Sequence, residues 1–108
     1  MATYTNTSYA VKNVGTSAST LTTVATATTA AIASLIVSNT SASPITTSVY
    51  FTRSGTDYYL VYQATVPVGG SLEVIQGNRV VLIAADVLKV INSAATSGDC
   101  IASVLLAA

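Results

Sequence analysis

The fold is decided by residues 31–90, which read AIASLIVSNT SASPITTSVY FTRSGTDYYL VYQATVPVGG SLEVIQGNRV VLIAADVLKV. The stretch divides into five or six short runs rich in β-branched and aromatic residues, each followed by turn-forming Gly, Pro, Asn, Asp or Ser. Ile45–Arg53 is the clearest run, because its side chains alternate between two faces as those of a half-buried strand do. The stretch therefore predicts successive antiparallel strands joined by tight turns.

A β-hairpin is predicted at the centre of this stretch. Residues 54–57, Ser-Gly-Thr-Asp, are expected to form its turn, since Gly55 is free to take a positive φ angle. In the return strand, residues 58–66, regular alternation places Tyr58 and Tyr62 on one side and Tyr59 on the other.

The hairpin also carries the one aromatic cluster of the chain. Its members are Tyr50, Tyr58, Tyr59 and Tyr62, with Tyr50 expected across the hairpin from the other three. Exposed tyrosines anchor protein partners or stack on sugar rings, and buried ones serve ordinary cross-strand packing. These four tyrosines are the predicted partner-binding residues, and a protein partner is preferred to a glycan.

Further strands are expected at residues 20–29, 32–37, 72–75, 80–83, 87–91 and 100–106, with a tight turn at residues 76–78. The run at 32–37 is apolar on both faces apart from Ser34, which predicts a strand buried on both faces. Residues 80–83 are also apolar on both faces and are expected to be central in a sheet. A helix over residues 25–35 is rejected because the threonines there lower helix propensity.

The turn signals recur about every eight to twelve residues, which is typical of sandwiches and jelly rolls. The chain is therefore predicted to be all-β, a single antiparallel β-sandwich or jelly roll of eight or nine short strands. No helix-period segment separates the strands, and a parallel α/β fold is excluded. Residues 21–108 are expected to form the β-sandwich domain, and the Thr- and Ser-rich residues 1–20 a flexible N-terminal arm or an edge strand.

Charge is scarce along the whole chain. Of 108 residues, 51% are hydrophobic and 7% are charged, and the formal net charge is zero. Four dispersed cations cannot neutralise a run of phosphates, which argues against nucleic-acid binding, and no basic stripe faces a membrane surface. No apolar run has membrane-spanning length and no secretory signal is predicted at the start. A surface this poor in ionic groups favours a subunit covered by copies of itself or by a larger assembly.

Reaction chemistry is not visible in the sequence. The chain has no histidine, so the usual general base and the commonest metal ligand are missing. Asp86 and Asp99 are expected in turns, serving the backbone, and Cys100 is expected to be an inert core residue. One alternative is kept: if Asp57 and Glu73 lie close together in the folded chain, they could serve as the paired carboxylates of a small hydrolase. No enzyme activity, catalytic residue, cofactor or metal site is predicted.

Three segments together resemble small virion structural proteins of tailed bacteriophages, notably those of phages infecting cyanobacteria. They are SNTSASPIT at residues 38–46, PVGGSLEVIQGNRVVL at 67–82 and DVLKV at 86–90, within a resemblance that covers about residues 31–105. Residues 82–90 are also similar to the L-x-x-G-D-x-L-x-V turn of jelly rolls of the tumour necrosis factor-like kind. Ala85 stands where that pattern has glycine, so the turn need not adopt a positive φ there.

The resemblance implies a non-enzymatic virion component present in many copies and assembled in the host cytoplasm. It implies a capsid decoration or cement subunit that stabilises the particle, or alternatively a tail or tail-fibre module that contacts the host surface. The implied partners are other virion proteins, either the major capsid protein or tail proteins. The implied oligomer is a homotrimer.

Overall fold

The computed structural model describes residues 3–75 and 79–108, and within them the chain is built from strands and turns without helix. The strands are β1 (Tyr4–Val14), β2 (Ser19–Thr23), β3 (Thr29–Asn39), β4 (Ile45–Arg53), β5 (Thr56–Val66), β6 (Ser71–Glu73), β7 (Val80–Leu82), β8 (Val87–Asn92) and β9 (Gly98–Ala107). The predicted turn at residues 76–78 lies outside the described residues. The rejection of a helix over residues 25–35 is confirmed.

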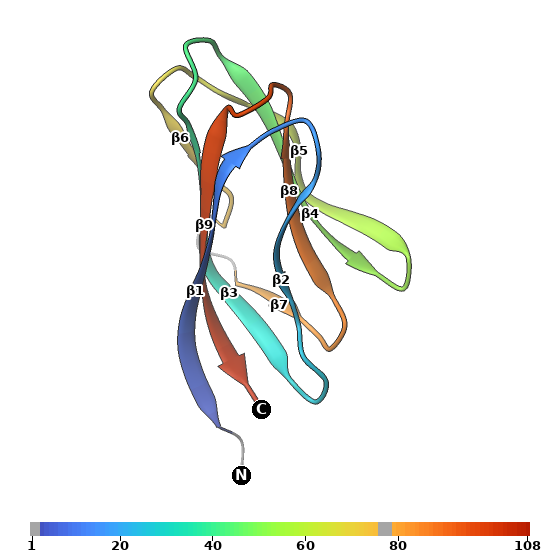
Figure 1. The fold of residues 1–108 in the computed structure, drawn as a ribbon. Helices are drawn as coiled ribbons and strands as arrows, with labels where there is room; N and C mark the ends of the chain where they lie inside the picture. Colours follow the sequence, from blue (N-terminus) through green and yellow to red (C-terminus); the bar gives the residue numbers. More distant parts are fainter. Residues whose placement is uncertain (1–2, 76–78) are drawn as a thin grey trace.

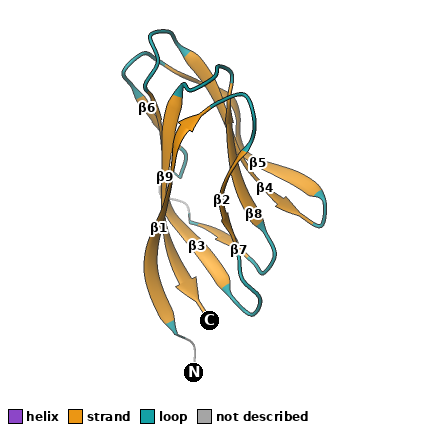
Figure 2. Cartoon of the chain, viewed as in Figure 1, coloured by secondary structure: helices purple, strands orange, loops and turns teal. Residues whose placement is uncertain are grey.

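Two antiparallel sheets pack face to face (Figures 1 and 2). The first has the order β1-β9-β3-β6, with β7 also pairing with β3, and the second has the order β2-β8-β4-β5. In the first sheet, β6 and β7 occupy the same edge of β3 in line, against residues 36–38 and 30–32. The predicted antiparallel β-sandwich is confirmed.

The strand pairing has the pattern of a jelly roll. Strands from the first half of the chain pair with strands from the second half in nested order: β1 with β9, β2 with β8, β3 with β6 and β7, and β4 with β5. The further pairs β3 with β9 and β4 with β8 complete each sheet. A long hairpin rolled upon itself in this way gives two four-position sheets, the double Greek key.

A single apolar cluster fills the space between the sheets. Its largest members are fully buried and come from both layers, among them Ile32, Leu35, Leu82 and Leu88. Near one end of this core, β9 passes close to β3 at Gly98. A Cβ atom at that position would overlap the carbonyl oxygen of Ser38 and come within 2.9 Å of the Asn92 side-chain amide, so the crossing requires glycine.

A β-bulge in β3 corrects the interpretation of residues 32–37. The register with β9 shifts between Ile32 and Ser34, so that Ile32 and Leu35, three residues apart, both face the core. Ile36 then points outward and is 42% exposed. The strand is apolar on both sides, as predicted, but it is buried on one side only, because nothing in the described chain covers the outer face of its sheet.

The position of β7 also differs from the prediction. Residues 80–83 were expected at the centre of a sheet, whereas β7 lies at an edge and has β3 as its strand partner among the described residues. Leu82 faces the core, but Val81 is 53% exposed. The apolar run therefore reflects an apolar outer surface and not burial on both faces.

The predicted hairpin between β4 and β5 is confirmed, with a shorter turn than expected. Arg53 pairs with Thr56, leaving Ser54 and Gly55 as the two turn residues. Both have positive φ, 53° and 78° respectively, which is the requirement of the two-residue turn that matches strand twist. In Figure 1 this hairpin extends away from the body of the sandwich.

The turn before β8 keeps the backbone of the similar jelly-roll turn at Ala85. Its φ is 71°, so the left-handed conformation is present although alanine replaces the glycine of the similar jelly-roll turn. The turn is held by Val24, the residue that follows β2, since the Ala85 amide donates to the carbonyl of Val24 at 2.9 Å and the Val24 amide donates to the carbonyl of Asp86 at 2.9 Å. Surrounding hydrogen bonds therefore impose a backbone conformation that alanine disfavours.

We expect Ala85→Gly to raise the free energy of unfolding by about 0.5 kcal/mol, because removing the Cβ relieves more strain than the added freedom of the unfolded chain costs. Ala84→Gly is the matched control, since Ala84 is also exposed and has no positive φ, and it should be destabilising. Urea unfolding monitored by circular dichroism measures both. Equal effects from the two substitutions would contradict the assigned strain.

Candidate interaction surfaces

The outer side of the first sheet is an uncharged surface, here called the serine–isoleucine face. Three cross-strand rows make it up: Asn6, Leu105, Ala31 and Val81; Ser8, Ser103 and Ser34; and Ala10, Ile101 and Ile36. None of these residues is charged. Charged side chains begin at its rim, where Glu73 pairs with Ile36 across β6 and β3.

Two large apolar side chains lie side by side on this face. Ile36 of β3 and Ile101 of β9 are register partners, and they are 42% and 52% exposed. The solvated face of an antiparallel sheet ordinarily carries polar side chains at such positions. Clustered exposed apolar residues on a sheet of this kind mark a contact surface.

A shallow hollow lies beside Ser8 and Ser103 on this face. Its volume is about 370 Å³, and it is lined by Asn6, Thr7, Ser8, Ala33, Ser103, Val104 and Leu105. The short side chains of Ser8, Ala33 and Ser103 leave this part of the face lower than the neighbouring Leu105. The serine–isoleucine face is therefore ridged, and a partner with complementary side chains can interlock with it.

The predicted tyrosine cluster forms a second surface, on the hairpin of β4 and β5. Tyr50 and Tyr59 are register partners with ring centroids 4.9 Å apart, and Tyr59 meets Tyr62 edge-on at 4.9 Å. Tyr59 and Tyr62 are 45% and 64% exposed, whereas Tyr50 lies buried beneath them. Burial is the main cause that raises the pKa of Tyr50 above its ordinary value.

The sides of β5 were predicted wrongly. Regular alternation grouped Tyr62 with Tyr58, but Tyr62 contacts Tyr59. The register between β4 and β5 shifts twice, between Thr47 and Val49 and between Val49 and Tyr50, and the extra residues in β5 change which side each side chain takes. Bulges of this kind leave no simple signal in an apolar–polar pattern.

The opposite side of the hairpin carries the fourth predicted tyrosine. Tyr58 stacks on Phe51 with ring centroids 5.3 Å apart, and the guanidinium of Arg53 lies 5.0 Å from the centre of the Phe51 ring. Tyr58 is half-exposed. The structure thus brings Tyr50, Tyr59 and Tyr62 together and sets Tyr58 apart, so the hairpin offers aromatic groups on both sides.

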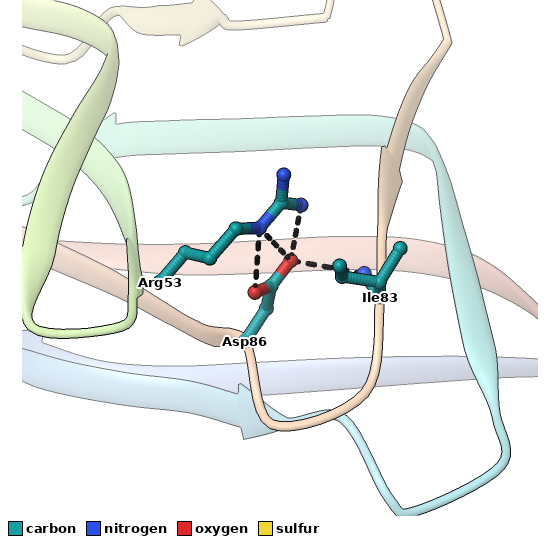
Figure 3. A network of polar contacts seen from close by, with 3 residues as sticks. All are labelled: Arg53, Ile83 and Asp86. Atoms are coloured by element: carbon teal, nitrogen blue, oxygen red, sulfur yellow. Dashed lines mark hydrogen bonds and ion pairs between the residues drawn. The ribbon is translucent and has the colours of Figure 1, made fainter.

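An ion pair connects the tip of this hairpin, next to its turn, to the turn before β8 (Figure 3). Arg53 donates from Nε and from one terminal nitrogen to the carboxylate of Asp86, with distances of 2.5–3.1 Å. The backbone amide of Ile83 donates to the same carboxylate at 2.9 Å. Asp86 is 1% exposed and Arg53 37% exposed at their side chains, so a partly solvated cation covers a buried anion.

The pKa of Asp86 is lowered, chiefly by the hydrogen bonds from Arg53. The hydrogen bond from the Ile83 amide lowers this pKa further, whereas burial of the carboxylate acts in the opposite direction. Asp86 was predicted to interact with the backbone of its turn, and the hydrogen bond from the Ile83 amide confirms this. The ion pair with Arg53 was not predicted. Asp99 lies in β9 and not in a turn, and its carboxylate accepts from the backbone amide of Asn13 at 3.0 Å.

The other carboxylates do not converge. Asp57 begins the return strand of the hairpin, where it accepts from the Thr52 hydroxyl at 2.7 Å, and Glu73 ends β6 in the other sheet. The two elements lie on opposite sides of the molecule (Figure 1). Among the described residues, no group of three His, Cys, Asp or Glu side chains is placed to hold a metal ion. Nor does the described part contain a helix of membrane-spanning length and hydropathy.

Cys100 is fully buried in β9, and its burial raises the thiol pKa to about 12. Because the thiolate is the reactive form, we expect Cys100 in the folded protein to be inert to a disulfide reagent such as Ellman's reagent at pH 8. Labelling should become complete in denaturant. Rapid labelling of the native protein would contradict the assigned position of the side chain.

Comparisons with protein-family models and with curated proteins gave no match. Among solved structures, the chain is similar to that of the Bacillus endospore appendages, described as a novel family of disulfide-linked pili, with a TM-score of 0.58 and 13% identity over 98% of this chain and 88% of that one. A chain of infectious bursal disease virus, Gx strain, gives a TM-score of 0.49 and 12% identity over 99% of this chain and 31% of that one. At these identities the likeness to the endospore appendage protein shows a shared β-sandwich fold and nothing finer.

Proposed function

We propose that the chain is a non-enzymatic structural subunit of a multi-copy assembly and, specifically, a virion protein of a tailed bacteriophage that decorates or cements the capsid. The observation that carries the structural role is the serine–isoleucine face. It is uncharged, ridged and carries Ile36 and Ile101 half-exposed side by side. A domain that stays alone in water leaves these apolar side chains exposed to solvent, whereas a subunit packed against other proteins buries them.

The choice of a phage virion rests on the three sequence segments at residues 38–46, 67–82 and 86–90. The endospore appendage protein of similar fold is described as forming disulfide-linked pili. A disulfide link is not proposed for this chain, because its only cysteine, Cys100, is fully buried.

Cementing requires no chemistry beyond binding. A subunit that binds the assembled shell and not its dispersed parts lowers the free energy of the assembled state, by an amount that grows with subunit concentration and affinity. The major capsid protein is the proposed partner.

Mass spectrometry of gradient-purified virions from the lysate in which the chain is made tests this proposal. The chain should sediment with the capsid protein in a fixed ratio, and particles lacking it should lose their genome at a lower temperature. Recovery of the chain only from the soluble fractions would contradict the proposal.

A tail or tail-fibre module that contacts the host surface is the second candidate, and the exposed pair Tyr59 and Tyr62 is the observation that favours it. If it is correct, the isolated chain should bind host cells or a glycan array, and Tyr59→Ala should remove that binding. Tyr4→Ala is a matched control, since Tyr4 is 68% exposed but lies in β1 of the other sheet.

The resemblance implies that copies of the chain form a trimer. Removing residues 1–20 does not test the oligomeric state cleanly, because Val14 at the end of β1 is a fully buried core residue. Point substitutions on β1 leave the core intact.

A further inference from the structure

Each sheet ends in strands whose outer backbone groups have no strand partner within the described chain. These edges are β1 and the β6–β7 line in the first sheet, and β2 and β5 in the second. An exposed edge pairs readily with another strand unless it is short, bulged, charged or interrupted by proline. The four edges differ sharply in these protective features.

Three of the edges are protected. β6 and β7 have three residues each, and β6 ends in the charged Glu73. β2 has five residues, and its register with β8 is irregular between Thr20 and Thr22. β5 is long, but its register with β4 shifts twice and Gln63 has a positive φ of 49°.

β1 has none of these features over most of its length. It pairs with β9 without interruption from Tyr4 to Val11. Residues 4–11, YTNTSYAV, contain no charge, no proline and no glycine. Side chains in this part of β1 are exposed or only half-buried, so the strand is poorly covered by its own subunit.

We propose that β1 pairs antiparallel with β1 of a second copy of this chain, about a two-fold axis at Ser8, so that Ser8 of one copy lies opposite Ser8 of the other. Pairing of this kind joins the first sheets of two copies into one continuous sheet through main-chain hydrogen bonds. The partner is a second copy because β1 is the unprotected edge that this chain itself provides, and an isologous contact satisfies both edges at once.

Charge also fits a second copy better than a charged partner. The first charged residue of the strand is Lys12, just beyond the regular part. In the antiparallel pair the two Lys12 residues lie at opposite ends, roughly 26 Å apart, which is well beyond the screening length in physiological salt. The pair is therefore free of like-charge repulsion, and because the remaining edges are protected it closes without growing into a fibre.

The pair places two serine–isoleucine faces on one surface. Asn6, Ser8 and Ala10 form the margin of the face in each copy, so the two margins meet at the two-fold axis. The joining of the two faces has a function only if the chain has the proposed structural role. The pairing of β1 with β1 does not depend on that role, because it is measured on the isolated chain.

Sedimentation of the purified chain, whose mass is 10.9 kDa, tests the pairing. The wild-type chain should sediment with twice that mass. Ser8→Lys and Ser8→Glu should each weaken association by roughly tenfold or more, because like charges then face each other across the axis. An equimolar mixture of the two variants should restore the pair. Ser8 is exposed, so the melting temperature of either variant should stay close to that of the wild type.

Thr65→Lys is the matched control, since Thr65 is an exposed residue of the bulged edge strand β5, and it should leave the mass unchanged. Three results would overturn the pairing. They are a single-chain mass for the wild type at high micromolar concentration, a three-chain mass, and a two-chain mass that neither Ser8 substitution reduces. If a monomeric Ser8 variant is incorporated into virions, the pairing is not required for incorporation, and the proposed structural role is unaffected.

Discussion

Replacing Asp86 with asparagine is expected to lower the free energy of unfolding by about 2 kcal/mol, which corresponds to a fall in melting temperature of roughly 10 °C. The carboxylate is 1% exposed and accepts hydrogen bonds from Arg53 and from the Ile83 amide. Asparagine keeps the shape but turns an NH₂ group toward one of these donors and removes the charge that Arg53 pairs with. Thermal unfolding at pH 7 measures the loss.

Asp57→Asn is the matched control, because Asp57 is an exposed carboxylate whose hydrogen bond is to the Thr52 hydroxyl, and its effect should stay below about 0.5 kcal/mol. Similar losses from both substitutions would show that the Arg53–Asp86 pair has no special role.

The Asp86 substitution should also change the response to acid. The folded-state pKa of Asp86 is lowered from its ordinary value, chiefly by the Arg53 hydrogen bonds. Its stabilising contribution is therefore complete above the unfolded-state value near 3.9, and it is lost as the pH falls through the lower folded-state value. The difference in stability between wild type and Asp86→Asn should be constant from pH 7 to about pH 5 and shrink below about pH 4.

On the proposed function, placing a lysine on the serine–isoleucine face should remove the chain from the virion. We expect Ile101→Lys to weaken incorporation by roughly 100-fold, because the proposed contact would then have to bury an unpaired ammonium group in place of an isoleucine. Ile36→Lys, at the register partner, should act similarly. Both side chains point outward, so the isolated domain should remain folded with a loss of at most about 1 kcal/mol.

Val68→Lys is the control for this experiment. Val68 is 52% exposed, as Ile101 is, but it lies in the loop between β5 and β6 and outside the face. Quantitative mass spectrometry of purified virions compares the three variants with the wild type. Normal incorporation of a stable Ile101→Lys chain would contradict the assignment of the face as the contact surface.

The sequence alone was sufficient for the fold class because turn chemistry and alternation act locally. The bounds of β4 were predicted to the residue, and the glycine turn that follows it was located correctly. Alternation failed where a bulge adds a residue. In β3 and β5, an extra residue moved Leu35 toward the core and Tyr62 to the side of Tyr59, and no pattern in a single sequence marks such a shift.

The serine–isoleucine face was missed for a different reason. Ile36 of β3 and Val81 of β7 were each predicted to be buried within the chain, because they are apolar. An apolar residue looks the same in the sequence whether its own chain or another protein buries it. Only the sheet order shows that these residues share one outer surface with Ile101. The ion pair between Arg53 and Asp86 was missed because its partners are distant in sequence and meet only through the β4–β8 pairing.

A reconstruction of the virion at side-chain resolution tests the central claim most directly. The account predicts a jelly-roll density for this chain in many copies, with Ile36 and Ile101 in van der Waals contact with a neighbouring protein subunit. A virion without this density, or one in which the serine–isoleucine face opens onto solvent in every copy, would contradict it.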